Sequence, residues 1–222
     1  MCGRYNIRKD SDTIKFLKEK GIDFNETELN ERFNITPGPP LKNPVLPNKT
    51  PLLLQYYQWG INNRMNGMRA DNILKIPKHR ELVSAQRCLV LASGFYEWKT
   101  LPGNTKQPYH FAFKDNRPFF MAGVWNTETE IKTGKPVTYF SIITTEPNDV
   151  VAQVHDRMPV ILPPQHYQTW LKHFSIDIYM QLLKPYNADE MRGFAVTPKV
   201  GNVRYDKPDC IEPFREQQLD LF

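Results

Sequence analysis

The sequence is short of cysteine and has no long apolar run. Its three cysteines are Cys2, Cys88 and Cys210, spread over 222 residues. They form neither a disulfide framework nor a C-x-x-C metal pattern, so we expect a reducing compartment and no metal or other cofactor. No apolar stretch approaches the roughly 20 residues of a membrane span, and the N-terminal residues do not resemble a signal peptide. We therefore expect a cytoplasmic protein.

Internal repeats, low-complexity tracts and linkers are also missing, so nothing in the sequence requires two domains. Apolar residues make up 40% of the chain and aromatic residues 12%, enough to bury a substantial core. Basic residues exceed acidic ones by 29 to 24, a formal net charge of +5. This mild excess suggests a polyanionic partner such as nucleic acid without identifying one.

Apolar segments separated by turn residues predict a mostly antiparallel sheet or barrel with a few helices, an α+β class. Prolines make residues 33–40 a rigid loop, and asparagine and glycine make residues 62–72 an irregular one. Ser11 or Asp12 is expected to cap the first helix and Gly21 to end it. Strands are predicted at 51–60, 87–98, 109–113, 119–125, 137–145, 160–162 and within 194–203, and helices at 11–20, 164–172 and 176–183, with a helical turn at 148–154.

Cys2 directly follows the initiator methionine. Once Met1 is removed, Cys2 carries a free α-amine and a thiol on adjacent carbons, with usual pKa values of roughly 8 and 8.5. Such a group can attack an aldehyde to give an imine that closes to a thiazolidine, or the thiol can act alone in acyl transfer. A methionine that merely happens to precede a cysteine is the alternative, and position alone does not decide between them.

Three further polar features stand out. Glu97 lies in an aromatic strand, His155 precedes the segment 156–159, and Arg69 and Asp71 lie in the loop 62–72. Each has a simpler explanation: an exposed carboxylate on an edge strand, a turn histidine capped by Asp156, and a solvated pair of charges. Taken separately, they indicate little.

The same features belong to a longer series of motifs. The series is Cys2-Gly3-Arg4-Tyr5, Phe33-Asn34 with Pro37-Gly38, Trp59-Gly60, Arg69 with Asp71, Gly94-Phe95-Tyr96-Glu97-Trp98-Lys99, Lys106-Gln107-Pro108, His155-Asp156-Arg157-Met158-Pro159 and Val200-Gly201-Asn202-Val203. In order, spacing and residue identity it resembles the SOS response-associated peptidase (SRAP) family of abasic-site processing proteins, from Cys2 to about Pro213.

The resemblance implies one α+β domain over residues 1–213 with a β-barrel-like core. It implies self-removal of Met1 and covalent capture of abasic sites in single-stranded DNA. Separately, we expect the protein to be a monomer. In that reaction Cys2 is the nucleophile, Glu97 transfers protons near the α-amine, and His155 is the acid and base at the sugar. Arg4, Arg69 and Arg157 would hold the flanking DNA phosphates, and Asn34 is also expected to bind DNA.

The chain departs from the family pattern in the loop before Arg69. An asparagine that orients the N-terminal residue usually stands where this chain has Gly67, so the role is assigned to Asn66, with Asn72 as the other candidate. The loop is also shorter and lacks the tryptophans that commonly follow Trp-Gly. Base stacking is then expected to be weaker, or taken over by Met65 and Met68.

Two other functions stay open at this point. One is a thiol hydrolase that uses Cys2 and His155 on peptides, and the other is a non-covalent module for single-stranded DNA. Turnover on peptides would identify the first, and unchanged affinity after loss of the thiol would identify the second.

The last residues, 214–222, form a separate tail in this interpretation. Its end resembles the short peptide by which bacterial replication and repair proteins bind the sliding clamp, with the contacts made by Gln218, Leu219, Leu221 and Phe222. A frayed terminus or a tail folded onto the core is the alternative, because leucine and phenylalanine are ordinary packing residues.

Overall fold

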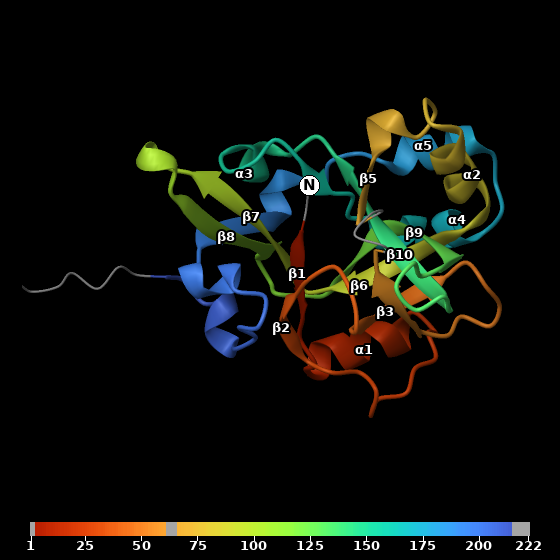
Figure 1. Cartoon of the computed structure of the whole chain (residues 1–222), viewed down its shortest axis with the longest axis horizontal. Helices are drawn as coiled ribbons and strands as arrows, with labels where there is room; N and C mark the ends of the chain where they lie inside the picture. The colour runs from red at the N-terminus through yellow and green to blue at the C-terminus, as the bar shows by residue number, and fades with distance from the viewer. Residues whose placement is uncertain (1–2, 61–65, 215–222) are drawn as a thin grey trace, which may run out of the picture.

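The computed structural model describes residues 3–60 and 66–214, which fold into two β-sheets with short helices around them (Figure 1). Paired strands run antiparallel except where β10 meets β4 and β5. The predicted α+β class with a mostly antiparallel core is confirmed. Within these two ranges, no helix is both long and apolar enough to cross a membrane.

One sheet contains a closed ring of strands. The ring closes because β9 pairs with β6 on one side and with β10 on the other. All six residues of β6 are buried, as expected for a strand inside a core. In ring order the strands are β10 (Pro136–Thr145), β4 (Gln55–Trp59), β3 (Lys42–Pro47), β6 (Arg87–Ala92) and β9 (Phe119–Thr129), and the short strands β5 (Gly67–Arg69) and β11 (Met158–Pro159) join β10.

The second sheet places the N-terminal strand in its interior. Figure 1 shows β1 in red between β7 and β2, and β1 is antiparallel to both. Both edges of β1 are therefore hydrogen-bonded, which fixes the direction in which the chain enters the fold. The strand order is β12 (Met191–Ala195), β8 (Lys106–Phe113), β7 (Gly94–Thr100), β1 (Arg4–Ile7) and β2 (Arg32–Ile35).

The single strand predicted at 87–98 is in fact two strands in different sheets, β6 and β7, joined by Ser93. The bend is held by β1, because the backbone N–H of Ser93 donates to the carbonyl of Asn6 at 2.8 Å. Gly94 follows at a point without space for a side chain, since a Cβ there would lie 2.2 Å from Nε2 of His110. The apolar run continues through this corner, which is why it resembles one strand.

Short helices cover the outside of the sheets. Asp10 caps the first helix by accepting from the backbone N–H of Thr13 at 2.9 Å, so the predicted caps Ser11 and Asp12 are wrong, whereas Gly21 follows its end with a φ of 63°. The α-helices are α1 (Ser11–Glu19), α2 (Pro77–Ala85), α3 (Asp149–Ala152), α4 (Tyr167–Leu171) and α5 (Ile176–Leu182).

Several predicted loops contain regular structure. Residues 33–35 belong to β2, and residues 67–72 form β5 and the 3₁₀ helix η1 (Ala70–Asn72). The strand predicted from residue 51 begins at Gln55, and β3 and α2 were not predicted at all. Near residues 160–162 the strand is β11, and Ile161 forms only an isolated bridge to Met121.

Candidate functional site

Glu97 lies within β7 with its carboxyl group buried. Its neighbours are β8, where Tyr109 is the paired residue, and β1, where Arg4 pairs with Tyr96. The Glu97 side chain is 3% exposed, and its Oε1 has no hydrogen-bond partner among the described residues. Burial raises the pKa of Glu97 to about 8, because the charged form loses its hydration. This environment excludes the alternative of an exposed carboxylate on an edge strand.

His155 approaches this carboxyl from the loop after α3. Its Nε2 lies 3.6 Å from Oε2 of Glu97, and its Nδ1 lies 3.1 Å from the backbone nitrogen and 3.3 Å from the carbonyl oxygen of Arg157. Whichever ring nitrogen carries the proton, Nε2 is the one that faces Glu97. Oδ1 of the exposed Asp156 also lies 3.2 Å from Nδ1, as the turn interpretation expected.

The packing of α3 fixes where this loop begins. Asn148 caps α3 by accepting from the backbone N–H of Val151 at 3.1 Å, and its amide donates to the carbonyl of Tyr186 at 2.9 Å.

Burial lowers the pKa of His155 below its usual 6.5. A carboxyl group with a raised pKa therefore lies beside an imidazole with a lowered one, and the two can give and take protons near neutral pH.

Asp71 joins two of the predicted DNA-binding arginines. Its Oδ2 lies 2.9 Å from Nη2 of Arg69, and its Oδ1 lies 3.0 Å from Nη2 of Arg157. The Arg69 side chain is 47% exposed, whereas that of Arg157 is 11% exposed and also donates to the carbonyl of Thr144 at 2.7 Å. The hydrogen bond from Arg69 is the main reason why the pKa of Asp71 falls to about 2. Sequence reasoning missed the Arg157–Asp71 pair.

Arg4 and Asn34 hydrogen-bond to each other and to a later segment of the chain. The Arg4 guanidinium donates to Oδ1 of Asn34 at 2.9 Å and to the carbonyls of Val200 and Gly201, and it lies 5.5 Å from the centroid of the Trp98 ring. Asn34 is 1% exposed. Its Nδ2 lies within hydrogen-bonding distance of three backbone carbonyls, those of Val200, Asn202 and Tyr205. Both side chains thus hold the segment 200–205 against β1 and β2.

The loop before Arg69 is described from Asn66 onwards. The carbonyl of Asn66 accepts the indole N–H of the buried Trp59 at 2.6 Å and the backbone N–H of Ile142 at 3.3 Å. Asn72 ends η1. The assignment of Asn66 to the N-terminal residue, with Asn72 as the other candidate, stays a prediction. Met68 is 1% exposed and packs in the core, so it presents no surface to a base.

Several predicted residues lie outside the described ranges. They are Cys2, Met65 and the tail residues Gln218, Leu219, Leu221 and Phe222. Within residues 3–60 and 66–214, no group of histidine, cysteine, aspartate and glutamate side chains is arranged to hold a metal ion.

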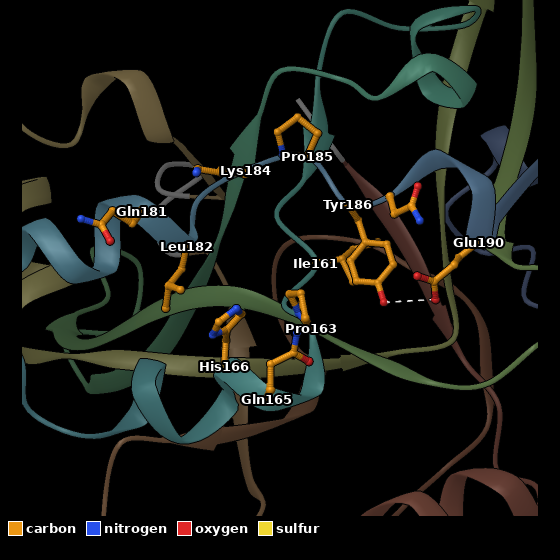
Figure 2. A pocket seen from close by; sticks show the side chains of 11 residues that line it. Ile161, Pro163, Gln165, His166, Gln181, Leu182, Lys184, Pro185, Tyr186 and Glu190 are labelled. Carbon is orange, nitrogen blue, oxygen red and sulfur yellow. Dashed lines mark hydrogen bonds between the residues drawn. The ribbon is translucent and has the colours of Figure 1, made fainter.

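A separate hollow of about 390 Å³ lies between the segments 161–166 and 181–190 (Figure 2). Figure 2 shows Tyr186 and Glu190 on one side of it, joined by a hydrogen bond of 3.4 Å, with Lys184 and Gln181 on the other. None of the residues predicted for the site lines this hollow. The chemistry of Glu97 and His155 is therefore not located there.

Comparison with known proteins identifies the family. A sequence model of the family described as SOS response associated peptidase (SRAP) matches residues 1–203. The abasic site processing protein YoqW of Bacillus subtilis is 31% identical over 229 residues, covering 96% of this chain and 99% of the relative. The abasic site processing protein HMCES of Gallus gallus is 30% identical, covering 68% of this chain and 50% of the longer relative.

The fold also has a counterpart among solved structures. A crystal structure of a Bacteroides thetaiotaomicron protein superposes with a TM-score of 0.80 at 24% identity, over 96% of this chain and 100% of that one. At this identity the likeness concerns the fold alone. The family match extends over most of the chain and includes the segments that carry Glu97 and His155. The chain therefore belongs to the SRAP family.

Proposed function

We propose that this protein processes abasic sites in single-stranded DNA by capturing them covalently through Cys2, after Met1 has been removed. The observation that carries the proposal is the buried Glu97 carboxyl, whose Oε1 has no partner among the described residues and whose Oε2 lies 3.6 Å from His155. A buried carboxyl without a partner is costly, so such a group is typical of a functional site. The abasic site processing relatives named above support the choice of substrate.

The strand register supports the role of the N-terminal amine. Because β1 and β7 are antiparallel with Arg4 opposite Tyr96, continuing this register by one residue sets Gly3 opposite Glu97. Cys2 follows Gly3 towards the N-terminus, and successive Cα atoms are about 3.8 Å apart. In this proposal the α-amine of a mature Cys2 reaches the Glu97 carboxyl.

The reaction requires proton transfers at both partners. A ring-opened abasic site presents an aldehyde at C1′ and a hydroxyl at C4′. The amine of Cys2, after losing a proton to Glu97, attacks the aldehyde carbon, and the adduct loses water to become an imine. The thiol sulfur then bonds to the imine carbon while the thiol proton passes to the nitrogen, which closes the thiazolidine. The net change is the loss of one water.

His155 is assigned to the sugar. Ring opening breaks the C1′–O4′ bond and leaves a proton on O4′, while a proton is removed from the hydroxyl on C1′. The contacts of Nδ1 with the Arg157 backbone orient the ring, and Nε2, which faces Glu97, is the nitrogen assigned to exchange these protons. The exposed guanidinium of Arg69 is the main phosphate contact in this proposal, whereas Arg157, Arg4 and Asn34 hold their surroundings in place. A site of this kind favours a splayed single strand.

The capture itself is tested with the purified protein. Its intact mass is expected to lack Met1, and incubation with a single-stranded oligonucleotide that carries one abasic site is expected to yield a heat-stable adduct. Cys2→Ser removes the sulfur and so should leave at most an imine that borohydride can trap. A heat-stable adduct from Cys2→Ala would refute the mechanism, and repeated turnover on peptides without an adduct would favour a thiol hydrolase.

The two proton-transfer groups should be separable. His155→Ala is expected to slow crosslinking by about 10²–10⁴-fold, the usual cost of losing an acid or base, with Met1 already removed. Glu97→Gln is expected to impair both crosslinking and Met1 removal, because Glu97 acts at the amine. Single-turnover rates together with intact masses check both variants. Crosslinking at the wild-type rate in either variant would contradict its assignment.

A further inference from the structure

The Asp71 carboxylate is bound by two guanidinium groups at once. Arg69 approaches it side-on, with Nε 3.3 Å from Oδ1 and Nη2 2.9 Å from Oδ2. Arg157 donates from Nη2 to the same Oδ1 at 3.0 Å. A guanidinium has five N–H donors in a fixed plane, so this arrangement uses one edge of Arg69 and leaves the rest of its donors for another acceptor.

The two arginines have different surroundings. Arg157 is largely buried and is anchored a second time at the carbonyl of Thr144, and its backbone N–H holds the His155 ring. Arg69 is 47% exposed on its side chain. Asp71 therefore ties an exposed cation to a rigid part of the protein that also carries His155.

Such a tie fixes a side chain that would otherwise sample many rotamers. A free arginine must lose this freedom when it binds a phosphate, which weakens binding. In this protein the side-on pair with Asp71 has already restricted Arg69 before DNA arrives. The remaining donors of Arg69 then match the oxygens of a phosphate, which arginine binds in a planar, two-bonded geometry.

We propose that Asp71 is a positioning residue for phosphate binding: its carboxylate holds Arg69, with Arg157 as the anchor, in the orientation that receives a backbone phosphate beside the abasic sugar. This inference rests on the proposed function. In the opposite case, the Asp71 carboxylate would compete with a phosphate for Arg69, and DNA would have to displace it. The two cases predict changes of opposite sign when the carboxylate is removed.

The test uses the full-length protein and a labelled single-stranded oligonucleotide with one tetrahydrofuran residue, which lacks the aldehyde and cannot crosslink. Asp71→Asn is expected to raise Kd about tenfold, since Arg69 regains its rotamer freedom. The slope of log Kd against log salt is expected to fall in magnitude by about 0.7, the value for one phosphate contact on a single strand. Asp71→Glu keeps a carboxylate within reach of both arginines and should stay within about threefold of wild type.

A charge-matched control separates positioning from simple repulsion. Asp156 is 84% exposed and lies close enough to Arg69 to act on its charge, but makes no hydrogen bond to it. Asp156→Asn removes a negative charge from the same region and should tighten binding. The gain should be about threefold at most, because exposed charges interact weakly in water. Melting temperatures show whether each variant is folded.

A second readout distinguishes positioning from damage to the site. With authentic abasic DNA at saturating concentration, the single-turnover crosslinking rate of Asp71→Asn should remain within about threefold of wild type, because Thr144 still anchors Arg157 and so His155. Unchanged Kd and salt slope, or tighter binding as in Asp156→Asn, would overturn the inference. A wild-type protein that neither binds nor crosslinks the DNA would instead overturn the proposed function itself.

Discussion

Burial of Glu97 links the ionisation of this residue to the stability of the fold. Its usual pKa is 4.5, and in the folded protein the pKa is about 8. Between these values the folded state binds more protons than the unfolded state, so the contribution of Glu97 to stability is fully present below pH 4.5 and is lost as the pH rises towards 8.

We therefore expect Glu97→Gln to be more stable than wild type at alkaline pH. At pH 5 the two free energies of unfolding should agree within about 1 kcal/mol, and at pH 8.5 the variant should be ahead by about 2–4 kcal/mol, since each pKa unit corresponds to about 1.4 kcal/mol. Urea denaturation followed by tryptophan fluorescence at both pH values measures the difference.

Glu128 provides the control for this experiment. The hydrogen bond from Lys78 lowers the pKa of Glu128, so its contribution is present at neutral pH and is lost on acidification. Glu128→Gln should accordingly lose stability relative to wild type at the higher pH. If the free energies of unfolding of wild type and Glu97→Gln changed with pH in parallel, the pKa of Glu97 would not be raised in the folded protein.

At the scale of secondary structure elements, Arg157 and Arg69 should differ although both bind Asp71. Arg157 connects η1 to β10, so Arg157→Ala should lower the free energy of unfolding by about 2 kcal/mol, the range for lost hydrogen bonds to a charged group. Arg69→Ala should leave the melting temperature unchanged but reduce the salt dependence of DNA binding by about one contact, or 0.7 in the slope.

Arg8 is the matched control for Arg69. It pairs with Asp10 two residues later at 3.0 Å, the same spacing as Arg69 and Asp71. Arg8→Ala should change neither the salt slope nor the crosslinking rate. A salt slope that is equal in Arg69→Ala and Arg8→Ala would place the path of the DNA elsewhere on the protein.

Asn34 should matter for the order of one segment. Its amide nitrogen lies 2.7–3.1 Å from the three carbonyls within residues 200–205, and its oxygen accepts from Arg4. Asn34→Ala should lower the free energy of unfolding by about 3 kcal/mol, because several buried polar groups lose their partners. Hydrogen exchange of residues 200–205 should accelerate at the same time. Exchange at the wild-type rate would mean that other contacts hold this segment.

The sequence predicted those elements whose apolar pattern is local. The strands at 109–113, 119–125 and 137–145 lie within β8, β9 and β10, and the helices near 167–171 and 176–182 are also confirmed. The strand β3 was missed because Pro44 and Pro47 argue against a strand, although Asn43 to Pro47 are buried. The helix α2 was missed because only Leu82 and Val83 are buried, too few for a periodic signal.

The residues of the candidate site also fall into those that the sequence predicted and those that it did not. Glu97 and His155 were recognised from motifs and their neighbours, and the structure brings the two side chains together. The Arg157–Asp71 pair could not be predicted, because its members are 86 positions apart and meet only when η1 and the loop after α3 pack against β10. The assignment of Arg4 and Asn34 to DNA stays a prediction, and their hydrogen bonds to each other and to residues 200–205 were not predicted, because a motif does not show these contacts.

At the scale of the whole molecule, the tail residues 214–222 are proposed to bind the bacterial sliding clamp. A labelled peptide of residues 212–222 should bind purified clamp with a micromolar Kd, which corresponds to a binding free energy of about −8 kcal/mol. Leu221→Ala/Phe222→Ala should abolish this binding, because the apolar pair is proposed to fill the pocket. A tethered motif would raise the local concentration of the protein at replication forks. Absence of saturable binding at high clamp concentration would contradict the assignment.

The interior position of β1 also has a consequence for protein synthesis. β1 is sandwiched between β2 and β7, and β7 ends at Thr100, so the sheet cannot close around β1 until that part of the chain has left the ribosome. At roughly 5–20 residues per second, synthesis of the first 100 residues takes about 5–20 s, during which β1 lacks its β7 partner. In the reaction proposed above, self-removal of Met1 depends on Glu97, which lies in β7. The proposed self-removal would therefore follow the synthesis of β7 and could not accompany that of β1.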